Sequence, residues 1–170
     1  IGSEQITYYN NSPDNLSYLW LQLDQNVRAN GSETPLVATN EMAYAMNSKK
    51  LQSLTNNYSN ANGRLFDGGF KISSVIDQDN RPLKYRIIKT MMRIDLETEL
   101  KSGEVFVFQI DWSYNINDRM SVGGRSGYEY FPKDQNYSYT IAQFYPRMVV
   151  YDDKEVVFGV TQYIANTSFQ

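Results

Sequence analysis

The sequence lacks histidine and cysteine, the two side chains that carry much of enzymatic proton, thiol and zinc chemistry. Neither residue occurs among the 170. This excludes a Ser-His-Asp triad, an H-E-x-x-H zinc site, thiol catalysis and disulfide bonds. We therefore expect the chain to be non-catalytic by itself and to contain no metal ligands of its own.

The densest group of recognition side chains is the segment Gln143-Phe144-Tyr145-Pro146-Arg147. A strand that reaches a proline must bend, end or lie at a sheet edge, because proline has no N–H to donate. One interpretation is that the bend turns Gln143, Tyr145 and Arg147 toward a cleft, where they would bind a substrate. The other is a bulged strand end, in which Arg147 pairs with the carboxylates of Asp152-Asp153.

Two further patterns match ligand-binding loops only in part. Asp77 and Asp79 have the alternate spacing of calcium ligands, but Arg81 and Pro82 follow where such a loop would continue. A plain β-turn explains this stretch. The segment Gly123-Gly124-Arg125-Ser126-Gly127 lacks the Gly-Lys-Ser/Thr of a phosphate-binding loop.

Aromatic residues are abundant, at 14% of the chain with 14 tyrosines. Exposed tyrosine rings could form a platform on which sugar rings stack. The candidates for such a platform are Tyr8, Tyr9, Tyr18, Tyr137 and Tyr139. The alternative is that tyrosine fills half-buried strand positions, with its hydroxyl group in solvent.

Alternation of apolar and polar residues predicts the strands that would position these side chains. It is clearest over 91–100 and 106–116, where a helix would scatter the apolar residues around its axis. We also expect strands at 4–10, 16–25, 70–77, 83–89, 128–131, 136–144, 148–151 and 156–163. The first two of these should form a hairpin, and 83–89 should pair with 70–77. A short helix is expected over 40–46.

These expectations define an all-β fold, either an antiparallel β-sandwich or a saddle-shaped curved sheet, with one short helical insertion. Residues 1–170 should form a single domain, and the uninterrupted last strand suggests that it was excised from a larger protein. The net charge of −3 and a pI near 5.0 argue against nucleic-acid binding. No segment reaches the roughly 18 apolar residues of a membrane span.

Three stretches resemble the N-terminal domain of the aminopeptidase N family of zinc metallopeptidases (gluzincins), especially its large bacterial members. The first is 9–16 leading into 19–26. The second is 75–83 followed by Thr90, Ile94, Leu96, Leu100 and Gly103. The third and most specific comprises 124–131, Ala142-Gln143-Phe144-Tyr145-Pro146-Arg147-Met148 and Tyr151-Asp152-Asp153.

The resemblance implies a saddle-shaped β domain that caps the active site of a multidomain peptidase. The zinc of that family is bound in a following thermolysin-like catalytic domain, which this chain does not include. Gln143 matches a family glutamine that helps to hold the free amino end of a peptide substrate. Tyr145 replaces the family's acidic residue, and a neutral phenol cannot supply the same charge attraction.

The leading hypothesis is therefore a non-catalytic N-terminal domain of a zinc aminopeptidase-like metallopeptidase. It would dock on the catalytic domain of the same polypeptide, and Gln143 and Tyr145 would line the substrate cleft with Arg147 as a supporting salt-bridge residue. The resemblance implies an extracytoplasmic bacterial location, without a membrane span. The alternative is a free-standing carbohydrate-binding or adhesive β-sandwich module.

Overall fold

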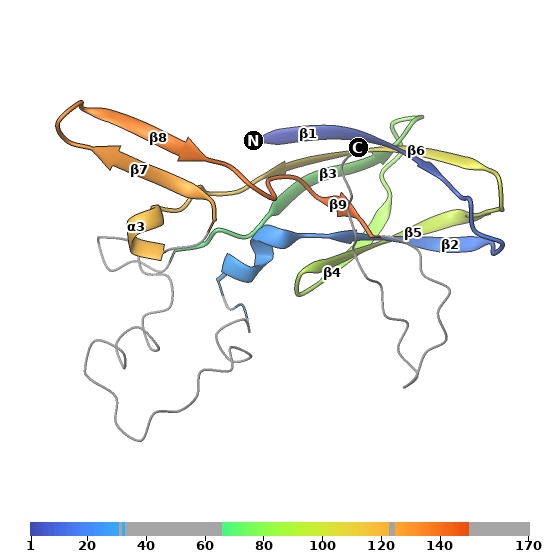
Figure 1. Cartoon of the computed structure of the whole chain (residues 1–170). Helices are drawn as coiled ribbons and strands as arrows, with labels where there is room; N and C mark the ends of the chain where they lie inside the picture. The colour runs from blue at the N-terminus through green and yellow to red at the C-terminus, as the bar shows by residue number, and fades with distance from the viewer. Residues whose placement is uncertain (31, 33–65, 123–124, 150–170) are drawn as a thin grey trace, which may run out of the picture. The chain divides into compact units, whose positions relative to one another are not determined.

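The computed structural model describes residues 1–30, 32, 66–122 and 125–149, and these are dominated by antiparallel strands (Figure 1). The predicted helix over 40–46 and the predicted strand over 156–163 lie outside the described residues. The described elements, in chain order, are β1 (Gly2–Tyr9), β2 (Leu16–Gln22), the 3-10 helix η1 (Asp24–Arg28), β3 (Lys71–Asp77), β4 (Lys84–Ile88), β5 (Met91–Leu100), β6 (Val105–Ser113), α3 (Arg119–Val122), β7 (Gly127–Phe131), β8 (Asn136–Thr140) and β9 (Arg147–Met148). The all-β prediction is confirmed, although neither η1 nor α3 was predicted.

The chain forms two compact units. The described part of the first unit comprises 1–24, 72–113 and 145–149, and that of the second comprises residues within 25–71 and 114–144. No helix among the described residues is long and apolar enough to cross a membrane.

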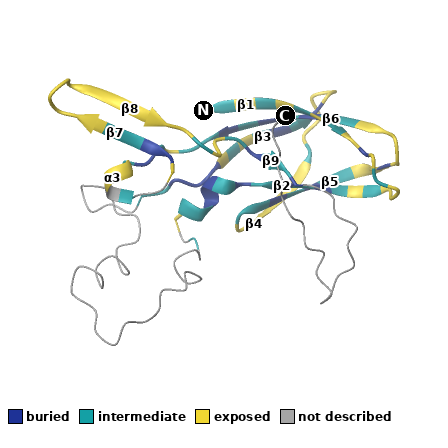
Figure 2. Cartoon of the chain, in the orientation of Figure 1, coloured by how far each residue is buried: buried dark blue, intermediate teal, exposed yellow. Residues whose placement is uncertain are grey.

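The first unit contains two antiparallel sheets, with strand orders β1-β6-β3 and β4-β5-β2-β9. Each sheet contributes one apolar face to a common core, and Figure 2 shows the buried positions along these strands. The core side chains are Leu19, Leu21, Leu23, Val75, Met92, Ile94, Leu100, Phe108, Ile110, Trp112 and Val149. The alternation predicted for β6 is confirmed, because Phe108, Ile110 and Trp112 are buried at every second position. In β5 it holds at Met92 and Ile94, whereas Thr98 is exposed.

The expectation that 4–10 and 16–25 form a hairpin is wrong. β1 pairs with β6, whereas β2 pairs with β5 and β9 in the other sheet. The intervening loop begins at Asn10, which is fully buried and whose side-chain amide donates to the carbonyls of Asp14 and Leu100 at 2.8 and 2.9 Å. Its Oδ1 accepts hydrogen bonds from Ser12. These bonds fix a crossing between sheets where the sequence suggested a turn within one sheet.

The predicted pairing of 83–89 with 70–77 is also wrong beyond its first contacts. β3 and the following segment share an isolated bridge between Ile76 and Pro82, and the Leu83 N–H donates to the Val75 carbonyl at 2.9 Å. Pro82 has no N–H with which to continue the ladder. β4 instead pairs with β5 along its whole length, from Lys84 to Ile88.

The second unit contains the hairpin β7–β8, which is joined by the predicted turn at 132–135. Gly127 begins β7 with φ 153°, and the Tyr128 N–H donates to the Asn117 carbonyl at 2.8 Å. A Cβ atom at Gly127 would lie 2.8 Å from that same carbonyl oxygen. Glycine is therefore required where the chain leaves α3 and enters the hairpin.

Candidate functional site

Gln143 lies in the second unit with an exposed side chain and a left-handed backbone, φ 53°. This conformation is uncommon for a residue with a Cβ atom. The buried amide of Gln25 holds it, because its Nε2 donates to the carbonyls of Ala142 and Gln143, each at 3.0 Å. The Oε1 of Gln25 accepts from the Arg28 guanidinium at 3.1 Å. The backbone around Gln143 is thus fixed from the protein interior while its side chain faces solvent.

Tyr145 and Arg147 belong to the first unit, and Arg147 is committed to a structural ion pair. Its Nε and Nη2 donate to the two carboxylate oxygens of Asp24 at 2.7 and 2.9 Å. The two side chains are only 15% and 13% exposed, so this bidentate pair is largely removed from water. Pro146 is fully buried, and Tyr145 is half-buried. The alternative ion pair of Arg147, with Asp152 or Asp153, involves residues outside those that the structure describes.

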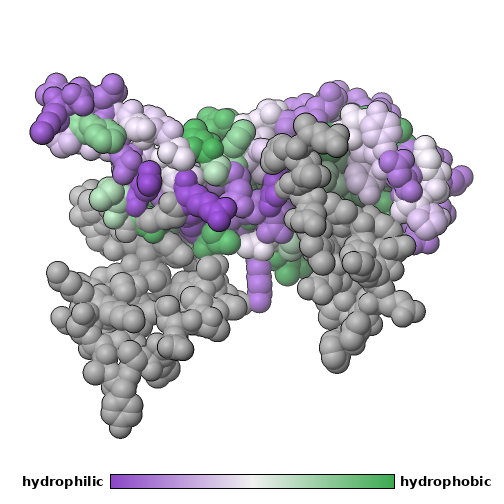
Figure 3. Space-filling model, in the orientation of Figure 1, coloured by the Kyte–Doolittle hydropathy of each residue, from purple (hydrophilic) through white to green (hydrophobic). Residues whose placement is uncertain are grey.

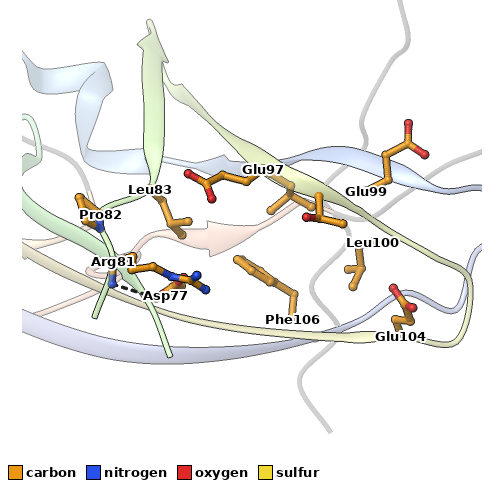
Figure 4. Close-up of a pocket in the computed structure, with 11 residues that line it drawn as sticks. Asp77, Arg81, Pro82, Leu83, Glu97, Glu99, Leu100, Glu104 and Phe106 are labelled. Carbon is orange, nitrogen blue, oxygen red and sulfur yellow. Dashed lines mark hydrogen bonds and ion pairs between the residues drawn. The ribbon is translucent and has the colours of Figure 1, made fainter. Parts of the chain in front are cut away.

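The described part of the first unit contains a cavity of about 260 Å³ between the β3–β4 turn, the end of β5 and the start of β6 (Figure 4). Leu83 and Phe106 point into it, whereas Glu99 points away. The lining residues are Asp77, Arg81, Pro82, Leu83, Leu96, Glu97, Thr98, Glu99, Leu100, Glu104 and Phe106. The cavity could receive a small apolar group.

The charged groups at the edge of this cavity already serve the local fold. Asp77 accepts hydrogen bonds from the N–H groups of Asp79 and Arg81, both at 2.9 Å, and from the Arg81 guanidinium at 2.8 Å. The Arg81 N–H, followed by its guanidinium, holds the pKa of the Asp77 carboxyl below its usual range. The turn that the sequence predicts for this stretch is confirmed.

Four tyrosines occupy one face of the β7–β8 hairpin. Tyr128 lies opposite Tyr139, and Tyr130 lies opposite Tyr137, with the rings of the second pair 4.8 Å apart. Tyr130, Tyr137 and Tyr139 are 47%, 52% and 57% exposed. The sequence identified only the two tyrosines on β8. The matching Tyr-x-Tyr pattern on both sides of the turn at 132–135 was the signal for the other two.

The three other tyrosines of the predicted platform, Tyr8, Tyr9 and Tyr18, do not share one exposed surface. Tyr9 is exposed on β1, whereas Tyr8 is half-buried on the opposite face of that strand. Tyr18 is covered by Arg93, whose guanidinium carbon lies 4.0 Å from the ring centre. Tyr137 and Tyr139 are the two candidates that lie together on an exposed face.

Glu4 is an ionisable group on the inner, apolar side of β1. It lies opposite the fully buried Ile110 and shares its face with Gly2 and Ile6. The ring of Trp112 covers Gly2, where a Cβ atom would come within 2.5 Å of it. The Glu4 Oε1 is buried and has no hydrogen-bond partner among the described residues. Burial raises the pKa of this carboxyl to about 7.

The described residues contain no group of three or more acidic residues close enough to hold a metal ion. Their distinctive features are a fixed loop that exposes Gln143 and an exposed tyrosine face, both of which suit binding. No protein-family model, curated protein or solved structure matches this chain significantly.

Proposed function

We propose that this chain is the non-catalytic N-terminal domain of a zinc aminopeptidase-like metallopeptidase. It would dock on the catalytic domain of the same polypeptide and contact the amino end of a peptide substrate through Gln143. The zinc ion and the hydrolytic residues would belong to the catalytic domain. Arg147 would stabilise the first unit through its ion pair with Asp24.

The observation that carries this proposal is the support beneath Gln143. A left-handed backbone at a residue other than glycine has an energetic cost, and such conformations concentrate at sites that bind ligands. Here the buried Gln25 amide stabilises the conformation through two hydrogen bonds at 3.0 Å. A side-chain amide presented in this way can accept a hydrogen bond from the ammonium group of a peptide.

The coding sequence that follows Gln170 provides the first test. An H-E-x-x-H motif within a few hundred residues would support the proposal, and a stop codon directly after Gln170 would contradict it. The isolated chain should neither hydrolyse aminoacyl amides nor bind zinc tightly. Stoichiometric, tight zinc binding measured by calorimetry would also contradict the proposal.

The sharper test changes Gln143 in the polypeptide that includes the catalytic domain. Gln143→Ala should raise KM for an aminoacyl p-nitroanilide about tenfold, the effect of losing one hydrogen bond to a charged group. Gln135→Ala is the matched control, because Gln135 is also exposed and also has a left-handed backbone, with φ 48°. Equal effects of the two substitutions on KM would reject a role for Gln143 in binding.

A second candidate, a carbohydrate-binding module, is favoured by the four-tyrosine face of the β7–β8 hairpin. Exposed rings with hydroxyl groups at their edges can both stack on sugars and form hydrogen bonds with them. Titration with soluble glycans should then shift the NMR signals of Tyr137 and Tyr139. Tyr85, which is 40% exposed on β4, is the internal control and should not shift. Unchanged spectra would remove this candidate.

A further inference from the structure

β8 is an open sheet edge in the described structure. Its only strand partner there is β7, and all five of its residues are exposed. The Tyr137 N–H donates to the side chain of Asn136 at 2.9 Å, so β7 does not use it. Main-chain groups alternate in direction along a strand, so the N–H and C=O of both Tyr137 and Tyr139 face away from β7.

The other edge strands of the described sheets carry features that discourage pairing with another chain. β1 has the ionisable carboxyl of Glu4 on its inner face, β3 begins at Lys71, and β4 has Lys84 and Arg86. β9 has only two residues, one of which is Arg147. Charged residues and short length are the usual means by which proteins protect a sheet edge.

β8 has none of these protective features. Its sequence, Asn136-Tyr137-Ser138-Tyr139-Thr140, contains no charge and no proline, and its register with β7 is continuous. The outer side of β7, by contrast, is occupied at Tyr128 by the bridge to Asp118. Within the part of the chain that the structure describes, the hairpin therefore offers one unprotected edge.

We propose that β8 pairs antiparallel with β8 of a second copy of this chain, about a two-fold axis at Ser138. A second copy is the partner because the sequence of β8 is nearly symmetric about Ser138, with a tyrosine on each side. When Ser138 faces its own copy, Tyr137 lies opposite Tyr139 of the other chain, and this occurs twice. The outward main-chain groups of these tyrosines then meet in about four hydrogen bonds. Two of these replace the bond that each Tyr137 N–H donates to its own Asn136 side chain in the single chain.

The side chains are compatible with this register on both faces of the extended sheet. On one face, tyrosine lies opposite tyrosine, and aromatic cross-strand pairs are favourable. On the other face, Ser138 meets Ser138, and Asn136 meets Thr140, so no like charges are brought together. The interface is the same on both copies and closes as a dimer, because β7 ends the sheet on each side.

The expected dimer is weak. Figure 3 shows a hydrophilic tip on the β7–β8 hairpin, with pale residues and one small hydrophobic spot on the face in view. Five paired residues bury less surface than a standard stable interface. We expect a dissociation constant between roughly 10 µM and 1 mM.

The first test is sedimentation of the 170-residue chain over that concentration range. The parent chain should shift from monomer to dimer, whereas Ser138→Lys should weaken dimerisation at least tenfold by placing two ammonium groups at the axis. The same substitution should leave the hairpin intact, because Ser138 lies opposite Glu129 on β7. Ser102→Lys, in the exposed β5–β6 turn, is the matched control and should dimerise as the parent does.

Two further measurements keep the result decisive. Mixing Ser138→Lys with the parent chain should restore part of the association, because only one ammonium group then lies at the axis. Tyr139→Pro should abolish dimerisation by removing an outward N–H, whereas Tyr139→Ala, which loses the same ring, should retain more of it. A parent chain that stays monomeric at 1 mM would overturn the proposal, as would a dimer that neither Ser138→Lys nor Tyr139→Pro weakens.

Discussion

Replacing Glu4 with glutamine should stabilise the protein at pH 8 and change its stability little near pH 4.5. The carboxyl lies on the apolar side of β1, and its buried Oε1 has no hydrogen-bond partner among the described residues. Burial therefore favours the protonated form and raises the pKa of Glu4 from 4.5 to about 7. Glutamine has nearly the same shape and is neutral at every pH.

The direction of the effect follows from proton binding. Between pH 4.5 and about 7 the folded protein retains a proton that the unfolded chain has lost. The associated stability is fully present below pH 4.5 and is lost as the pH rises through about 7. The difference in pKa corresponds to roughly 3 kcal/mol for a fully buried group. Glu4 is half-buried, so solvent screening reduces this to on the order of 1–2 kcal/mol.

Urea denaturation of the parent chain and of Glu4→Gln, at intervals from pH 4.5 to pH 8, measures this difference. The sequence contains no histidine, so the side chains that usually titrate in this range do not contribute. At pH 8 the variant should be more stable by about 1–2 kcal/mol, or roughly 2–8 °C in Tm. Glu99→Gln, at an exposed position on β5, should follow the parent. A Glu4→Gln variant that is less stable than the parent at pH 8 would refute the reasoning.

Two further predictions concern the supports of the loop and the hairpin. Arg147→Met should lower the free energy of unfolding by about 3 kcal/mol in urea denaturation, because it leaves the Asp24 carboxylate buried without its cation. Arg86→Met removes an exposed ion pair, since Arg86 is 56% exposed and lies 3.5 Å from Asp95, and it should lower the free energy of unfolding by less than about 1 kcal/mol. Equal losses of stability in the two variants would contradict a structural role for the pair of Arg147 with Asp24. Gly127→Ala should cost roughly 1–3 kcal/mol because its Cβ would meet the Asn117 carbonyl. Gly103 also has a positive φ, 82°, but open space surrounds it, so Gly103→Ala should lower the free energy of unfolding by less. Near-UV circular dichroism of the tyrosines should show loss of the hairpin in Gly127→Ala only.

β5 and β6 could be predicted from the sequence because apolar and polar residues alternate along them. Their pairing could not be predicted in the same way. Asn10 reads locally as the start of a turn, yet its side chain bonds to Leu100, a residue 90 positions away. The predicted hairpin failed because a long-range hydrogen bond determines where the chain crosses between sheets.

The candidate site was predictable to the level of side-chain type. Gln143 and Arg147 stand out in the sequence because a proline follows strand-like residues. The left-handed backbone at Gln143 and its support by Gln25, 118 positions away, have no local signature. Arg147 has a nearer pair of acidic residues in sequence than the Asp24 with which it bonds. Sequence patterns therefore indicated which residues to consider, whereas the fold determined which of them face solvent.

Glu4 and β8 both concern strands that lie at the edge of a sheet. A carboxyl on the inner face of β1 lowers stability above its pKa of about 7, so its presence calls for a compensating benefit. A charge on the inner face makes the edge of β1 a poor partner for another strand, because the added strand would bury the carboxyl further. β8 has no such ionisable group, and its two tyrosines and its threonine are residue types that favour strands. Where one edge of a chain carries an inward ionisable carboxyl at a cost in stability and another edge carries no such group, the second edge is the one suited to a partner.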